Sequence, residues 1–107
     1  MVCPQESQTY ERKTSVGEWQ EIVETVAAFA TANGGTIEVG IRPDGSTAGV
    51  EIGAGTIEDL VNKIRQNTDP RQAPSVHVTH TGRKKLIVLR VGESSDKPVL
   101  AFGRPYK

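Results

Sequence analysis

The 107-residue sequence has little of the material on which several classes of protein depend. Its single cysteine, Cys3, cannot form an internal disulfide, which agrees with a reducing compartment. No apolar run approaches the roughly 20 residues that cross a bilayer, and the N-terminus lacks the basic start and apolar stretch of a signal peptide. We therefore expect a cytoplasmic protein that does not bind a membrane.

The sequence also has no net charge and few aromatic residues. Thirteen lysines and arginines balance 13 acidic residues, which argues against a protein that binds nucleic acid tightly over its whole surface. Basic residues nevertheless dominate from Lys63 to Lys107, and this half is either a candidate binding face or a set of solvated charges at strand ends. Aromatic residues make up only 5% of the chain, so contacts to a nucleic-acid backbone are favoured over base stacking.

Two segments have the periodicity of helices. Ser15 and Glu18 have the spacing of a capping box, which predicts a helix that begins near Val16. Its apolar stripe consists of Trp19, Ile22, Val23, Val26, Ala27 and Ala30. The glycines of "NGG" at 33–35 end this helix. A second helix is predicted from about Thr56 to Asn67.

The remaining segments alternate or are continuously apolar, as strands are. We predict a strand at 37–41, a turn at 43–45 and an antiparallel return at 47–52. Strands at 76–81 and 84–92 are joined at Gly82, and the apolar run at 86–89 indicates a central strand. A last strand is predicted at 99–102. The pattern predicts one α+β domain over residues 1–107, in the order β-α-β-β-α-β-β-β, with a mixed or mostly antiparallel sheet of about five to six strands and two helices packed on it.

The turn in this pattern also has the glycine spacing of a phosphate-binding loop. Such a loop is written G-x-x-x-x-G-K-[ST] and leads from a strand into a helix whose N-terminus holds the phosphates. Here Ser46 stands at the lysine position, and the predicted loop leads into another strand. We therefore interpret "RPDGST" as a hairpin turn and expect no ATP binding and no ATPase activity.

Motifs along nearly the whole chain have the spacing of one known family. They are "ERK" at 11–13, "VAAFATANGGTIEVGI" at 26–41, "DGSTAGV" at 44–50, "NKI" at 62–64, "DP" at 69–70, "LIVLRV" at 86–91 and "SSDKPVLAFGRPYK" at 94–107. Together they resemble the Schlafen AlbA-type domain, also called the divergent AAA domain. The resemblance implies an α+β fold with helices on one side of the sheet and a role in binding nucleic acid within transcriptional regulators and RecG-like, helicase-related proteins. In that family the domain precedes larger C-terminal domains, so we expect a fragment of a longer protein.

The resemblance also implies a candidate nuclease site. Schlafen relatives include endoribonucleases with a carboxylate cluster, and their E-x-x-x-x-E-x-K segment matches Glu6, Glu11 and Lys13. The family has a third carboxylate after the "GG" strand, and Asp44 is the only acid in that turn here. Arg42 and Pro43 stand where the family often has two successive acids, so the third carboxylate is displaced or absent. Three converging carboxylates would hold Mg²⁺ or Mn²⁺, and no other cofactor is expected.

Three functions remain open from the sequence. The leading hypothesis is a module that binds DNA or RNA through phosphates. Its candidate contact residues are Lys63, Arg65, Arg71, Arg83, Lys84, Lys85 and Arg104. The alternatives are a metal-dependent endoribonuclease that uses Glu6, Glu11 and Asp44, and a protein-interaction or dimerisation module, such as a homodimer, that pairs through an exposed sheet edge.

Overall fold

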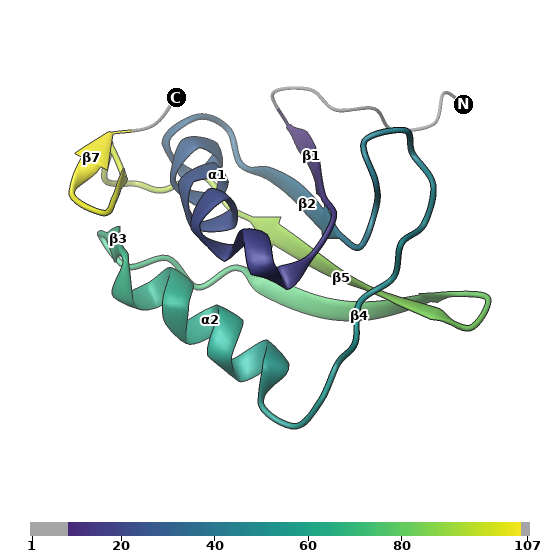
Figure 1. Ribbon diagram of the computed structural model, residues 1–107. Helices are drawn as coiled ribbons and strands as arrows, with labels where there is room; N and C mark the ends of the chain where they lie inside the picture. The colour runs from purple at the N-terminus through teal and green to yellow at the C-terminus, as the bar shows by residue number, and fades with distance from the viewer. Residues whose placement is uncertain (1–8, 106–107) are drawn as a thin grey trace.

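The computed structural model describes residues 9–105, which form an α+β fold with mixed sheets, as predicted (Figure 1). The elements are β1 (Tyr10–Lys13), the 3-10 turn η1 (Val16–Glu18), α1 (Trp19–Thr31), β2 (Gly35–Val39), α2 (Thr56–Gln66), β3 (Thr68–Asp69), β4 (Ser75–Thr81), β5 (Lys84–Val91), β6 (Leu100–Ala101) and β7 (Arg104–Pro105). Within the described residues, neither helix is long and apolar enough to span a membrane.

The first helical segment begins near Val16, as predicted, but its first turn is the 3-10 turn η1 and α1 itself begins at Trp19; α1 ends at Thr31, just before the predicted stop at 33–35. The Glu18 carboxylate accepts hydrogen bonds from the backbone N–H groups of Thr14 at 2.7 Å and Ser15 at 3.2 Å. The Glu18 side chain therefore holds the turn that precedes the helix. The predicted stripe lies in the core, with Trp19 packed at its border. After the helix, the N–H of Gly34 donates to the Phe29 carbonyl at 2.7 Å and turns the chain into β2.

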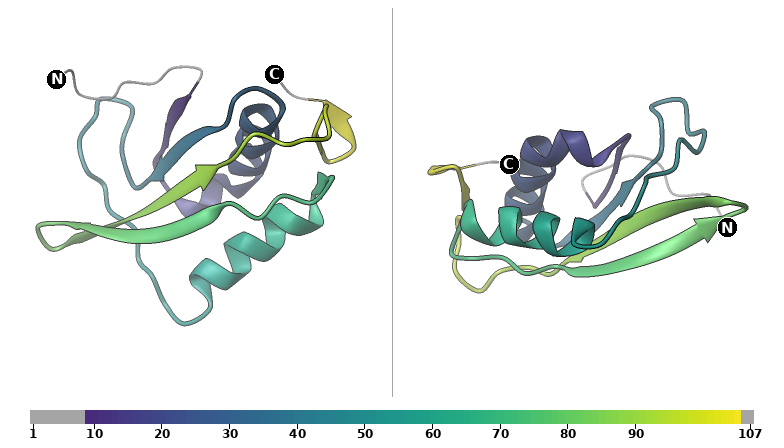
Figure 2. Two further views of the ribbon diagram at one scale, coloured as in Figure 1. Left: turned by 180° about the vertical axis from the view of Figure 1, so that it is seen from behind. Right: turned by 60° about the horizontal axis from the view of Figure 1, so that its bottom comes forward.

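The main sheet has the strand order β1-β2-β5-β4. β1 is parallel to β2, and the other two pairs are antiparallel. Both helices lie on one side of this sheet (Figure 2, right), and their apolar faces pack on alternate residues of β2 and β5. β5 is central, as predicted, and all of its residues from Leu86 to Leu89 are buried.

The predicted return strand at 47–52 is wrong. The turn itself forms, because the N–H of Arg42 donates to the Ser46 carbonyl at 2.8 Å, but only one bridge, Ile41 with Thr47, follows it. β2 already has β1 on one edge and β5 on the other, so it offers no edge to a returning strand. Residues 48–55 instead cross to α2 as a loop, and the N–H of Val50 donates to the Lys85 carbonyl at 2.9 Å.

The last predicted strand, at 99–102, is shortened to β6, and β7, which the sequence did not predict, follows it to form a small hairpin. β6 pairs with β7 and, on its other edge, with β3, which directly follows α2. The described strands therefore form a four-stranded and a three-stranded sheet rather than one sheet. Phe102 and Gly103, which join β6 to β7, both have positive φ angles, of 53° and 76°.

Candidate functional site

The tip of the β4–β5 hairpin carries three consecutive basic residues. Gly82, with φ of 63°, and Arg83 form the two-residue turn, and Lys84 and Lys85 are the first residues of β5. Because successive strand residues point to opposite faces, the two lysines leave the strand on opposite sides. Arg83 lies in the turn, so the alternation of strand residues does not determine the side to which it points.

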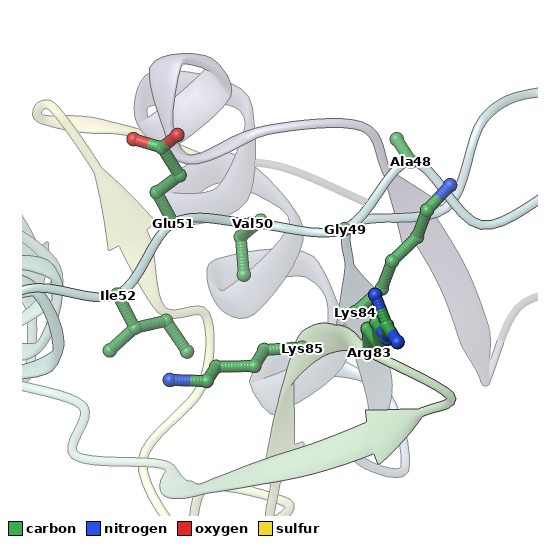
Figure 3. A pocket seen from close by; sticks show the side chains of 8 residues that line it. All are labelled: Ala48, Gly49, Val50, Glu51, Ile52, Arg83, Lys84 and Lys85. Carbon is green, nitrogen blue, oxygen red and sulfur yellow. The ribbon is translucent and has the colours of Figure 1, made fainter.

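The loop that follows β2 passes close to this tip and forms a groove with it. The groove has a volume of about 590 Å³ and is lined by residues 48–52 on one side and 83–85 on the other (Figure 3). Lys84 extends toward Ala48 and Lys85 toward Ile52. The Lys84 ammonium donates to the Thr47 carbonyl at 2.8 Å, which ties the tip to the loop.

Positive charge dominates this groove. Arg83, Lys84 and Lys85 are all exposed, and within residues 9–105 none of them forms an ion pair with a carboxylate. Glu51 is the one acidic residue of the lining. Three adjacent cations at an open groove can contact successive phosphates of a polyanion, and the absence of aromatic side chains from the lining offers no surface on which a base would stack.

The other basic candidates lie outside this groove. Lys63 on α2 pairs with Asp59 at 3.0 Å, and its ammonium lies 4.9 Å from the ring centre of Trp19. The three remaining candidates are all exposed: Arg65 lies on α2, Arg71 after β3 and Arg104 on β7. The structure thus brings three of the seven candidates together and leaves four elsewhere.

The candidate carboxylates are not assembled in the described part of the chain. Glu11 faces α1, where its oxygens lie 3.6 Å from the Lys13 ammonium and 3.3 Å from the Thr25 hydroxyl. Asp44 Oδ1 accepts the Ser46 hydroxyl at 2.6 Å and the Ser46 N–H at 2.9 Å. These two bonds hold the pKa of the Asp44 carboxyl below its usual 3.8.

Glu6 lies outside the described residues. Within residues 9–105 there is no group of three or more His, Cys, Asp and Glu side chains that could hold a metal ion. The described residues therefore do not provide a ligand set for Mg²⁺ or Mn²⁺, and a site that includes Glu6 stays a prediction.

Sequence reasoning missed the loop wall of the groove. The pattern at 47–52 predicts a strand, whereas residues 48–52 form a loop beside the hairpin tip. The available signal was Gly49, which has φ of 79° and passes so close to β5 that a Cβ would lie 3.1 Å from the Cβ of Lys84. A glycine inside a strand-like pattern often marks such a close approach.

The chain is an α+β domain with a basic groove at one hairpin tip, and comparison identifies its family. Residues 6–107 match the family model described as Schlafen, AlbA_2, so the chain belongs to this family. No curated protein sequence matches the chain.

Two solved structures share the fold. The DIP2311 protein from Corynebacterium diphtheriae is 19% identical with a TM-score of 0.73, over 89% of this chain and 19% of that one. The N-terminal domain of a protein from Nitrosomonas europaea, described as related to the ATP-dependent DNA helicase RecG, is 23% identical with a TM-score of 0.66, over 97% of this chain and 82% of that one. This chain therefore corresponds to about a fifth of the length of the C. diphtheriae protein. At these identities the likeness shows the fold alone.

Proposed function

We propose that this chain is a nucleic-acid-binding module that contacts backbone phosphates through the basic groove of residues 48–52 and 83–85. The observation that carries the proposal is the cluster of three exposed cations, without carboxylate partners in the described residues, in a chain of zero net charge. Such a cluster attracts a polyanion locally, although the molecule as a whole does not.

The family and one relative support this proposal. The chain belongs to the Schlafen AlbA_2 family, and the N. europaea protein of similar fold is described as related to a DNA helicase. The similar region occupies 19% of the C. diphtheriae chain, which supports a module that acts within a larger regulator or helicase-related protein.

The lining of the groove favours binding that depends on phosphates rather than on base sequence. Lysine and arginine side chains neutralise phosphates and position the ligand, whereas stacking on bases needs aromatic rings and the usual recognition of adenine edges needs amide side chains. The lining contains neither aromatic nor amide side chains. We therefore expect modest affinity, strong salt dependence and little preference among sequences.

The test compares two double variants that change the net charge equally. Arg83→Glu with Lys85→Glu alters the groove, and Arg65→Glu with Arg71→Glu alters two exposed cations outside it. Binding to fluorescent duplex DNA and duplex RNA is measured by anisotropy across a salt series. The groove variant should bind far more weakly, and its salt slope should fall by about 2, because each lost phosphate contact reduces the slope by about 1.

The control variant should keep most of the affinity of the parent chain. Circular dichroism should show that both variants are folded. If the groove variant binds like the parent at every salt concentration, the groove is not the contact surface. If only the Arg65 and Arg71 variant loses affinity, the α2 region is the contact surface instead. The comparison of the affinities for duplex DNA and duplex RNA shows which of the two polymers the groove prefers.

A further inference from the structure

Strand β4 is an edge of the main sheet, and its outer side has no partner in the described structure. β4 pairs only with β5, in an unbroken register from Ser75 opposite Arg90 to Thr81 opposite Lys84. Within residues 9–105, β4 forms no hydrogen bonds other than those of this pairing. The N–H and C=O groups on its outer side are therefore available to another strand.

The two edges of the sheet differ in protection. Proteins usually block edge pairing with charged side chains, proline, bulges or short strands. β1, the opposite edge, has four residues, and three of them are Glu11, Arg12 and Lys13. β4 has seven residues, "SVHVTHT", without an acidic residue, lysine, arginine, proline or bulge. Only β4 has the composition of a strand that can accept a partner.

The exposed surface of β4 also contains an apolar side chain. Val78 is 39% exposed, and besides Phe102 it is the only large hydrophobic side chain of residues 9–105 with such exposure. The Thr81 end of β4 projects beyond both helices, whereas α2 lies toward the Ser75 end (Figure 1). α2 itself lies on the helix side of the sheet near the Ser75 end of β4, so it leaves the projecting half of the strand open (Figure 2, right).

We propose that a second copy of this chain pairs with this edge. The two β4 strands run antiparallel about a two-fold axis in the projecting half, Val78–Thr81, and join two four-stranded sheets into one continuous sheet. A strand without acidic, lysine or arginine side chains can pair with its own copy without placing such charges opposite each other. Because the main sheet of each copy has one open edge, β4, and one charged edge, β1, pairing of the main sheets closes at two copies.

The helices and the hairpin tips are compatible with this arrangement. A two-fold axis in the projecting half moves the α2 helix of each copy away from that of the other copy, since α2 lies toward the opposite end of β4. The two tips point in opposite directions, because the strands are antiparallel. The inference does not rest on the proposed function and would hold for a chain that binds no nucleic acid.

The first test is the oligomeric state in the absence of nucleic acid. Sedimentation is measured over a concentration series for the parent chain, Val78→Lys and the control Ser95→Lys, an exposed residue of the loop after β5. The parent and the control should form a concentration-dependent dimer, and Val78→Lys should raise the dissociation constant by about tenfold or more. Thr79→Lys, on the other face of the same strand, should act in the same way and replaces Val78→Lys if that variant does not fold.

The second test determines the pairing geometry. In a Cys3→Ser background, single cysteines are introduced at Val78, Thr79, His80 and Thr81, with Ser95→Cys as the control, and the proteins are oxidised with glutathione disulfide. A two-fold antiparallel pair places one position directly opposite itself, so cross-linking should peak at one of the four positions. A parent chain that is monomeric at every concentration overturns the proposal. So does a dimer that withstands both lysine substitutions, or a control that cross-links as well as the best β4 position.

Discussion

At Gly34 the chain passes from α1 into β2 with φ of 84°, and a Cβ at this position would lie 2.5 Å from the Val91 carbonyl oxygen. An alanine would therefore incur both the left-handed backbone cost and a clash with the backbone of β5. Gly82 also has a positive φ, of 63°, but no atom lies within 4 Å of a Cβ there. A substitution at Gly82 therefore has only the conformational cost of a positive φ, whereas one at Gly34 has this cost and a steric clash as well.

We predict that Gly34→Ala destabilises the fold more than Gly82→Ala does. The Gly82 variant should lose about 1 kcal/mol, which is the usual cost of a left-handed alanine, and the Gly34 variant about 2 kcal/mol or more. Urea unfolding followed by circular dichroism measures both. If the two variants lost equal free energy of unfolding, β5 would move aside without cost, and the role of Gly34 would be limited to its positive φ.

The Asp44 carboxyl gives a second prediction for a single residue. Its pKa lies below 3.8 because the Ser46 hydroxyl and N–H donate to it. A folded-state pKa below the unfolded value means that the carboxylate stabilises the turn at neutral pH, and that this contribution is lost as the pH falls through the folded pKa. Ser46→Ala should raise the pKa toward 3.8, as measured by NMR titration of the carboxyl carbon, whereas Ser95→Ala should leave it unchanged.

At the scale of elements, an aromatic pair connects α1 with the β6–β7 turn. The rings of Trp19 and Phe102 meet edge to face, with centres 6.1 Å apart and an angle of 61° between their planes. The Lys63 ammonium of α2 contacts the same indole. Phe102, which makes this contact, has φ of 53°, in the left-handed region that side chains disfavour.

Substitutions at Phe102 should separate strain from packing. Phe102→Ala loses the ring contact and keeps the backbone strain, whereas Phe102→Gly loses both. We therefore expect the glycine variant to be more stable than the alanine variant by about 1 kcal/mol, the reverse of the usual order. The fluorescence of Trp19, the only tryptophan, follows unfolding. An alanine variant that equals or exceeds the glycine variant in stability would show that the turn relaxes when the ring is removed.

The elements that the sequence predicted well are those set by local interactions. The capping residue Glu18, the apolar stripe of α1 and the glycine turn at Gly82 act within a few positions of the chain. The return strand at 47–52 failed because β1 and β5, which are distant in sequence, occupy both edges of β2. The loop wall of the groove was missed for the same reason, whereas the basic tip of the hairpin was predicted from a local run of three residues.

For the whole molecule, we predict that nucleic-acid binding does not require a divalent metal. The proposed groove neutralises phosphates with arginine and lysine side chains, and the described residues contain no carboxylate set for an ion. EDTA should therefore leave the affinity unchanged at constant ionic strength. The nuclease alternative with Glu6 and Glu11 would be supported instead if EDTA removed binding, Mn²⁺ restored it, and Glu11→Ala prevented that restoration.

The central pair of the main sheet has a consequence for how the chain folds. β2 and β5 lie side by side, yet Gly35 pairs with Val91, so a large part of the chain separates them. Closing a long loop costs entropy before the paired strands return any stability, and such topologies fold more slowly than those built from local contacts. During synthesis, α1 and β2 leave the ribosome well before β5, and the apolar face of α1 lacks the part of its cover that β5 provides until the chain has been made as far as Val91.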